Sequence, residues 1–187
     1  MTAMERAAGD RSADGAGLLD HDAIAARVPH AGRMCLLDRV LSWDADHLEC
    51  TARPSAGAVS HPLAQEGGLP ATAAIEYAAQ AMALHGFLVQ ERAAQEDEVL
   101  PDRPEDNASR QEPRRGFLAG LRTVRLHARW IDSGSPLLAI RIERFAGDEV
   151  QVLYDFEVRG KGPIAQGRAV VVLDAAARAA SRREVKP

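Results

Sequence analysis

The chain has 187 residues, a formal net charge of −4 at neutral pH, and 46% hydrophobic residues. This length and hydrophobic content are typical of one globular domain. The acidic balance argues against nonspecific nucleic-acid binding, which needs a basic surface. The longest apolar run, residues 71–89, is interrupted by Glu76, Gln80 and His85. We therefore expect no membrane span, which would need about 20 apolar residues with few charges.

Two further features concern the compartment in which the chain works. Residues 1–10 contain no apolar core, so we expect no signal peptide. The two cysteines, Cys35 and Cys50, have no metal-ligand spacing and are too few for a disulfide framework. The expected compartment is the cytoplasm.

The first quarter of the chain predicts an extension, a helix and two strands. Residues 1–17 are rich in Ala, Gly, Asp and Ser, which favours disorder. Residues 18–28 predict a short helix with Asp22 as its N-cap. Residues 34–43 and 47–53 predict two paired strands around a short acidic turn.

A long helix and a run of strands follow. The helix is predicted over residues 70–91, and residues 92–115, rich in charge and proline, are predicted to be a flexible insertion. Residues 175–187 are predicted to be a disordered tail, which leaves 18–174 as the folded domain. Four hairpin-linked strands are predicted at 117–130, 136–145, 149–159 and 164–173. An antiparallel sheet wrapped around one central helix, an α+β fold, is the economical way to bury that helix.

The stretch from His61 to Glu76 carries the candidate chemistry. A histidine ends a strand-like region, a Gly-Gly-x-Pro turn follows, and an apolar helix then carries one carboxylate in its first turns. An acid and a base at a helix mouth suit proton transfer next to a carbonyl, followed by loss of a neighbouring group. A carboxylate on an apolar helix needs a partner, protonation or a function.

Each polar residue around this stretch also has a structural interpretation. Glu76 could be paired with an arginine, and Gln80, one turn later, could either orient the site or make a structural contact. His30 is interpreted as part of a structural lead-in to the first strand. His85 is interpreted as a core or dimer-contact residue, and Tyr77 as a core residue.

Four motifs, in this order, resemble the β-hydroxyacyl-acyl-carrier-protein dehydratases of the FabA/FabZ type, which have the hot-dog fold. They are Val28–Val40 with its Pro-His lead-in, the His61–Glu76 loop and helix start, Glu76-x-x-x-Gln80, and Gly116–Arg125. The resemblance covers roughly residues 20–174.

The chain departs from that family at three points. Pro62-Leu63-Ala64 replaces a Phe-Pro-Gly stretch, Ala71 replaces the glycine after the turn proline, and the His61–Glu76 spacing of 76 − 61 = 15 is one residue longer. These departures resemble a divergent subgroup found with aryl-polyene and related polyketide-like clusters.

The resemblance implies a substrate and a mechanism. The substrate is a 3-hydroxyacyl thioester on the phosphopantetheine arm of acyl carrier protein, and no metal or other cofactor is expected. His61 removes a C2 proton, and Glu76, kept protonated by its apolar helix, donates to the departing C3 hydroxyl. The N–H of Ala71 holds the thioester oxygen, with Pro70 and Gln80 supporting the site.

The resemblance also implies partners. Family enzymes build each site from two subunits, so a homodimer, or a heterodimer with another hot-dog subunit, is the expected active unit. Arg122 and Arg125 lie in a basic run that would steer an acidic carrier protein. A solvated strand face is the alternative interpretation of that run.

Two other functions stay open at this point. A hot-dog acyl thioesterase shares the fold and also uses a helix carboxylate. A non-catalytic hot-dog subunit could support an active dehydratase without turnover. The product of the expected dehydration is a trans-2-enoyl thioester, in fatty-acid-, polyene- or polyketide-like biosynthesis.

Overall fold

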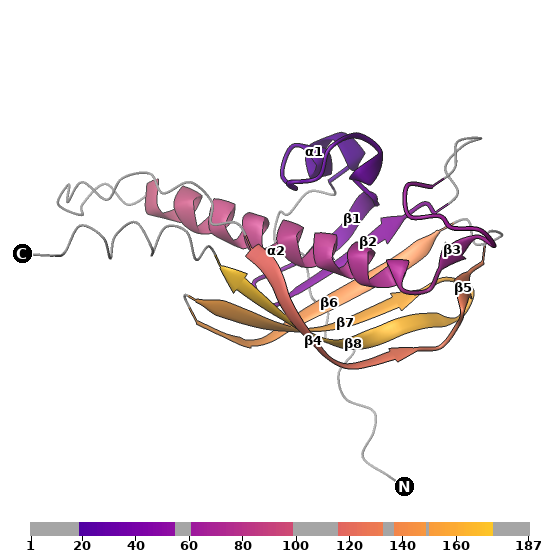
Figure 1. The fold of residues 1–187 in the computed structure, drawn as a ribbon. Coiled ribbons are helices and arrows are strands. Elements are labelled where there is room, and N and C mark those ends of the chain that lie inside the picture. The colour runs from indigo at the N-terminus through magenta and orange to yellow at the C-terminus, as the bar shows by residue number, and fades with distance from the viewer. Residues whose placement is uncertain (1–18, 55–60, 99–115, 133–136, 149, 174–187) are drawn as a thin grey trace, which may run out of the picture.

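The computed structural model describes residues 19–54, 61–98, 116–132, 137–148 and 150–173. The predicted disordered ends, 1–17 and 175–187, lie outside these residues. The chain forms one large antiparallel sheet with a long helix lying across one of its faces (Figure 1). The α+β hot-dog architecture expected from the sequence is confirmed.

Six strands form the sheet in the order β1-β2-β6-β7-β8-β4, and every neighbouring pair is antiparallel. Two short strands, β3 and β5, pair separately. The elements are α1 (His21–Ala25), the 3₁₀ turn η1 (Gly32–Met34), β1 (Leu37–Trp43), β2 (His47–Ala52), β3 (Leu69–Pro70), α2 (Ala73–Glu98), β4 (Gly116–Leu126), β5 (Trp130–Ile131), β6 (Leu138–Gly147), β7 (Gln151–Arg159) and β8 (Pro163–Leu173).

The N-cap of the short first helix lies two residues before the predicted one. Asp20 is the N-cap, because its side chain accepts a hydrogen bond from the N–H of Ala23 at 3.0 Å. Asp22 instead lies in the first turn, where its charge still favours the helix dipole. The helix is held by buried Ile24 and by Arg27, which follows it and makes two 3.2 Å contacts with the carboxylate of Glu91 on α2.

The central helix begins at Ala73 and runs to Glu98, seven residues past its predicted end. Residues 92–98 of the predicted insertion are therefore helical, and residues 99–115 lie outside the described part of the chain. Its sheet-facing side is built largely of alanines around larger residues such as Tyr77, Leu84 and Leu88. Small side chains let the helix lie close to the sheet.

The predicted strand 117–130 is broken in the structure. The β4–β8 pairing shifts register between Arg122 and Arg125, where Thr123 has a φ of 49°, and β5 leaves the large sheet to pair with β3. β4 is an edge strand of the sheet. It exposes four large apolar side chains, namely Phe117, Leu118, Leu121 and Leu126.

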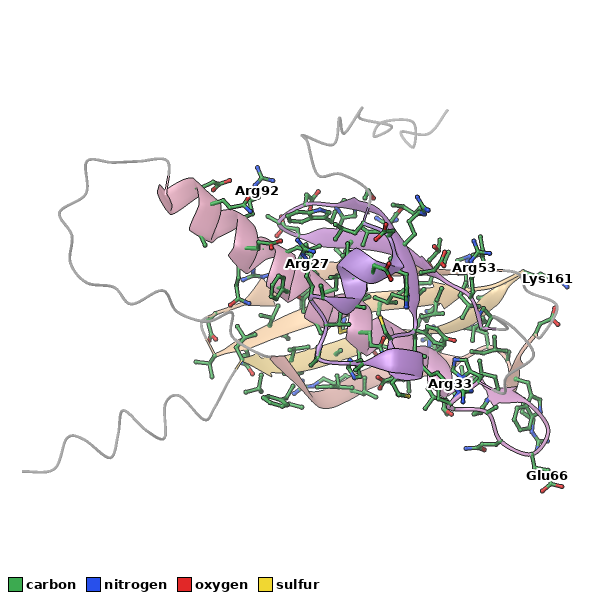
Figure 2. The ribbon with its side chains drawn as sticks, turned by 90° about the horizontal axis from the view of Figure 1, so that it is seen from above. Arg27, Arg33, Arg53, Glu66, Arg92 and Lys161 are labelled. Carbon is green, nitrogen blue, oxygen red and sulfur yellow. The ribbon has the colours of Figure 1, made fainter. Side chains whose placement is uncertain are left out.

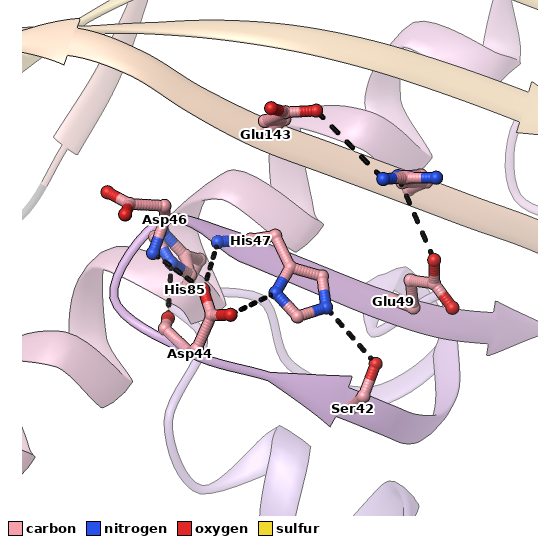
Figure 3. Close-up of polar contacts among 8 residues, drawn as sticks. Ser42, Asp44, Asp46, His47, Glu49, His85 and Glu143 are labelled. Carbon is pink, nitrogen blue, oxygen red and sulfur yellow. Dashed lines mark hydrogen bonds and ion pairs between the residues drawn. The ribbon is translucent and has the colours of Figure 1, made fainter. Parts of the chain in front are cut away.

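His85 belongs to the core, as predicted. Its Nε2 donates to the carbonyl of Asp44 at 3.0 Å, so its Nδ1 accepts from the hydroxyl of Tyr154, also at 3.0 Å. Figure 3 shows this ring beside the β1–β2 turn, where Asp44 also contacts His47. His85 therefore fastens the middle of α2 to that turn.

Cys35 and Cys50 are both free and buried. Among the described helices, none is long and apolar enough to cross a membrane.

Candidate active site

The segment that carries His61 is a tightly built turn. Gln65 and Gly68 exchange two backbone hydrogen bonds of 2.9 and 3.0 Å, which places Glu66 and Gly67 at the tip. Gly67 has a φ of +101°, and a Cβ there would lie 3.1 Å from the ring of Trp130. Glycine is therefore required at this position. Figure 2 shows Glu66 at the outer end of this turn.

The start of α2 is clamped by the β3–β5 pair. Pro70 pairs with Trp130, and the N–H of Ala71 continues the pairing by donating to the carbonyl of Arg129 at 3.0 Å. The expectation that Ala71 supplies a free N–H to a substrate oxygen is therefore wrong. The next two N–H groups, of Thr72 and Ala73, find no acceptor among the described residues.

A depression of about 410 Å³ opens where this turn meets α2. Glu76 lines it together with the residues that follow His61 and those that begin the helix: Pro62, Leu63, Ala64, Gln65, Pro70, Thr72 and Ala73. The Glu76 side chain is 33% exposed in the single chain. The predicted burial of this carboxyl in wholly apolar surroundings is therefore not observed.

Gln80 holds Glu76 from one turn further along the helix. Its amide nitrogen donates to Glu76 Oε1 at 3.0 Å and to the carbonyl of Met34 at 2.8 Å, and its oxygen accepts from the N–H of Leu36 at 2.9 Å. The two backbone groups fix which end of the amide faces Glu76, since a carbonyl can only accept and an N–H can only donate. Gln80 is fully buried, and its contacts hold Glu76 and tie α2 to the segment just before β1.

The imidazole beside Glu76 within one chain is that of His30. Its Nε2 lies 3.3 Å from Glu76 Oε1, and both side chains are about one-third exposed. The sequence motif placed His30 in a structural lead-in, and its spacing from Glu76 gives no local signal of a contact.

His61 has different partners. The N–H of Leu63 donates to its Nδ1 at 3.1 Å, so the neutral ring carries its proton on Nε2, which lies 2.9 Å from the hydroxyl of buried Tyr77. Partial burial is the main cause that lowers the pKa of His61, and the nearby Arg33 guanidinium lowers this pKa further. Both effects favour the neutral form. In one chain, His61 and Glu76 form neither a hydrogen bond nor an ion pair with each other.

The two arginines expected to bind a carrier protein lie elsewhere. Arg122 and Arg125 are exposed on β4, and Arg125 lines a separate depression of about 650 Å³ that also contains Arg141 and Arg168. Neither lines the depression beside Glu76. The cation whose charge acts on His61 is Arg33, a residue that the sequence analysis did not single out (Figure 2).

No three His, Cys, Asp or Glu side chains gather as metal ligands within the described ranges. The groups available for chemistry at this end of α2 are therefore a carboxyl, two imidazoles, a phenol and the helix-start N–H groups.

Comparison with known proteins agrees with the motifs. A family model described as ApeP-like, ApeP dehydratase, matches residues 22–100, which include the whole His61–Glu76 stretch. The chain resembles the divergent hot-dog dehydratases. No curated protein matches the sequence.

Two solved structures agree with the fold. A chain of the dehydratase heterocomplex ApeI:P from Xenorhabdus doucetiae has a TM-score of 0.65 and 23% identity, over 89% of this chain and 98% of that one. The PaaI protein of E. coli, from the phenylacetic acid degradation operon, has a TM-score of 0.50 and 13% identity, over 81% and 88%.

Proposed function

We propose that the chain dehydrates a 3-hydroxyacyl thioester, carried on acyl carrier protein, to the trans-2-enoyl thioester. The observation that carries this proposal is Glu76, which presents a carboxyl in the depression at the start of α2 and is held there by Gln80. The match of the dehydratase family model to this part of the chain supports it.

The proposed reaction moves two protons and breaks one carbon–oxygen bond. His61 takes the C2 proton, the electron pair forms the C2–C3 double bond, and the C3 hydroxyl leaves as water with a proton from Glu76. The N–H groups of Thr72 and Ala73, rather than that of Ala71, are the proposed donors to the thioester oxygen, where the helix dipole adds to their effect.

The base and the acid are proposed to come from two subunits. The neutral ring of His61 offers its lone pair to Leu63 and its proton to Tyr77 within its own chain, so it must give up the Leu63 contact, or exchange its proton, before acting as a base. A neighbouring subunit that completes the site supplies a reason for such a change. The ApeI:P structure is a dehydratase heterocomplex. This supports a hot-dog partner for the present chain, either a second copy or a related chain.

The β4 edge is the proposed place of that contact. Phe117, Leu118 and Leu121 stand exposed on an edge strand, and exposed apolar groups on such an edge favour strand-to-strand association. The pair would extend the sheet from one chain into the next.

The thioesterase and the non-catalytic subunit remain the rival functions. Incubating a 3-hydroxyacyl carrier protein with the purified chain, and measuring both enoyl product and free thiol, separates them. Enoyl formation supports dehydration, and thiol release without enoyl product supports a thioesterase. The chain is a non-catalytic subunit if it forms no product alone but activates a second hot-dog subunit, and if Glu76→Gln leaves that activation unchanged.

A further inference from the structure

We propose that His30 is a positioning residue for Glu76, holding one carboxyl oxygen so that the other faces the substrate. The inference deepens the proposed dehydratase function and rests on it for its catalytic part. His30 Nε2 and the Gln80 amide both approach Oε1, at 3.3 and 3.0 Å. Oε2 has no partner among the described residues and is the oxygen that remains for proton transfer to the hydroxyl.

The backbone around His30 is fixed by the same network. Gln80 bonds to Met34 and Leu36, so the segment just after His30 is tied to the helix that carries Glu76. Pro29 restricts the chain before it, and η1 begins two residues after it. The ring is thus carried by a segment with little freedom to move away from α2.

A purely structural role explains this ring poorly. The Nδ1 atom of His30 is buried and has no hydrogen-bond partner among the described residues. A polar atom left in that state costs stability, and such atoms in native proteins call for an explanation. Among the described residues, the one polar contact of the ring is with the candidate acid, so the placement of His30 serves Glu76.

His61 is held differently from His30. Both ring nitrogens of His61 are occupied within the chain, by Leu63 and Tyr77. His30 is the imidazole that approaches the carboxyl directly. Its contact is longer than an ideal hydrogen bond, and catalytic contacts commonly tighten when substrate binds.

Two substitutions test whether His30 acts as a hydrogen-bond donor to Glu76 or only fills space. His30→Gln keeps an N–H donor near the position of Nε2, whereas His30→Phe keeps the ring shape without a donor. We expect His30→Phe to lower kcat about 10- to 100-fold with KM nearly unchanged, because misplacing a reacting group by about 1 Å costs up to about 100-fold. His30→Gln should stay within about threefold of wild type. His127→Phe, at an exposed histidine, is the matched control and should behave as wild type.

A second readout does not depend on activity. In the full chain with ¹⁵N-labelled histidine, the imidazole signal that disappears in His30→Phe belongs to His30, and Glu76→Gln should shift it. An unmoved signal would overturn the contact. Wild-type kcat in His30→Phe, or equal losses in His30→Phe and His30→Gln, would overturn the positioning role. A wild-type chain that has no dehydratase activity in its native assembly would overturn the proposed function instead, and the NMR shift would then test the His30 contact by itself.

Discussion

Glu76 and Gln80 show what sequence spacing can predict at the scale of single residues. Their i, i+4 separation places them on one face of a helix, and the structure joins them at 3.0 Å. The contacts from His30 to Glu76 and from Gln80 to Met34 join residues 46 positions apart, so they depend on how β1 and α2 pack. Sequence spacing also gives no sign that the N–H of Ala71 is occupied, because this hydrogen bond depends on where β5 leaves the large sheet.

Replacing Gln80 tests the residue-scale network. Gln80→Leu fills a similar volume but leaves the N–H of Leu36 and the carbonyl of Met34 without their partner. An unsatisfied buried polar group costs about 1–3 kcal/mol, so we expect unfolding in urea to show a loss of about 2–4 kcal/mol. Gln151→Leu, at an exposed glutamine, is the control and should change stability little. A loss below about 1 kcal/mol for Gln80→Leu would mean that this buried amide is not needed to satisfy those groups.

At the scale of elements, the alternating segments predicted β2, β6, β7 and β8 correctly, because one face of each central strand packs against α2. The charged end of α2 misled the prediction. Residues 92–98 have few core contacts to offer, yet they continue the helix, supported by an i, i+4 pair between Arg92 and Glu96. The register shift within β4 was also missed, since the residue with positive φ there, Thr123, is a threonine rather than a glycine.

The packing of α2 against the β1–β2 turn makes stability depend on pH. Burial, the main cause, lowers the pKa of His85, whose ring is faced by Tyr154, Asp44, Arg144 and His47. The unfolded chain takes up a proton near pH 6.5 while the folded chain resists it, so stability falls as pH falls through that value. His85→Gln removes this titration. Its melting temperature should fall less than that of wild type between pH 7.5 and 5.5, and parallel curves would contradict the account.

At the scale of the whole molecule, two features of the single chain bear on the proposed assembly. His61 and Glu76 do not meet, and the β4 edge exposes apolar side chains. Both features are those expected if a second hot-dog chain adds to this edge.

Substitutions on the two edge strands of the sheet, β4 and β1, test this assembly. Leu118→Lys with Leu121→Lys places charges on β4 and should break the association, as measured by sedimentation, together with dehydratase activity. Leu41→Lys places a charge on exposed Leu41 of β1, at the opposite edge, and should change neither. Unchanged sedimentation of the β4 variant would move the contact to another surface.

Arg122 and Arg125 allow a test of carrier-protein docking. Reversing both charges to Glu should raise KM for the acyl-carrier substrate and weaken its salt dependence, because steering by charge is screened by ions. Activity on a small pantetheine thioester should hardly change. Arg92→Glu, near the far end of α2, is the control. Equal losses on both substrates would show that these arginines support the fold or the chemistry instead.

The most direct test of the central claim is the rate of enoyl formation from a 3-hydroxyacyl carrier protein by the chain in its native assembly, with and without Glu76→Gln. Gln keeps the shape of Glu but cannot donate the carboxyl proton. Loss of a positioned acid costs about 10²–10⁴-fold in rate. We expect a loss in this range for Glu76→Gln, with the melting temperature and the assembly unchanged. Enoyl formation at the wild-type rate by the Glu76→Gln variant would contradict it.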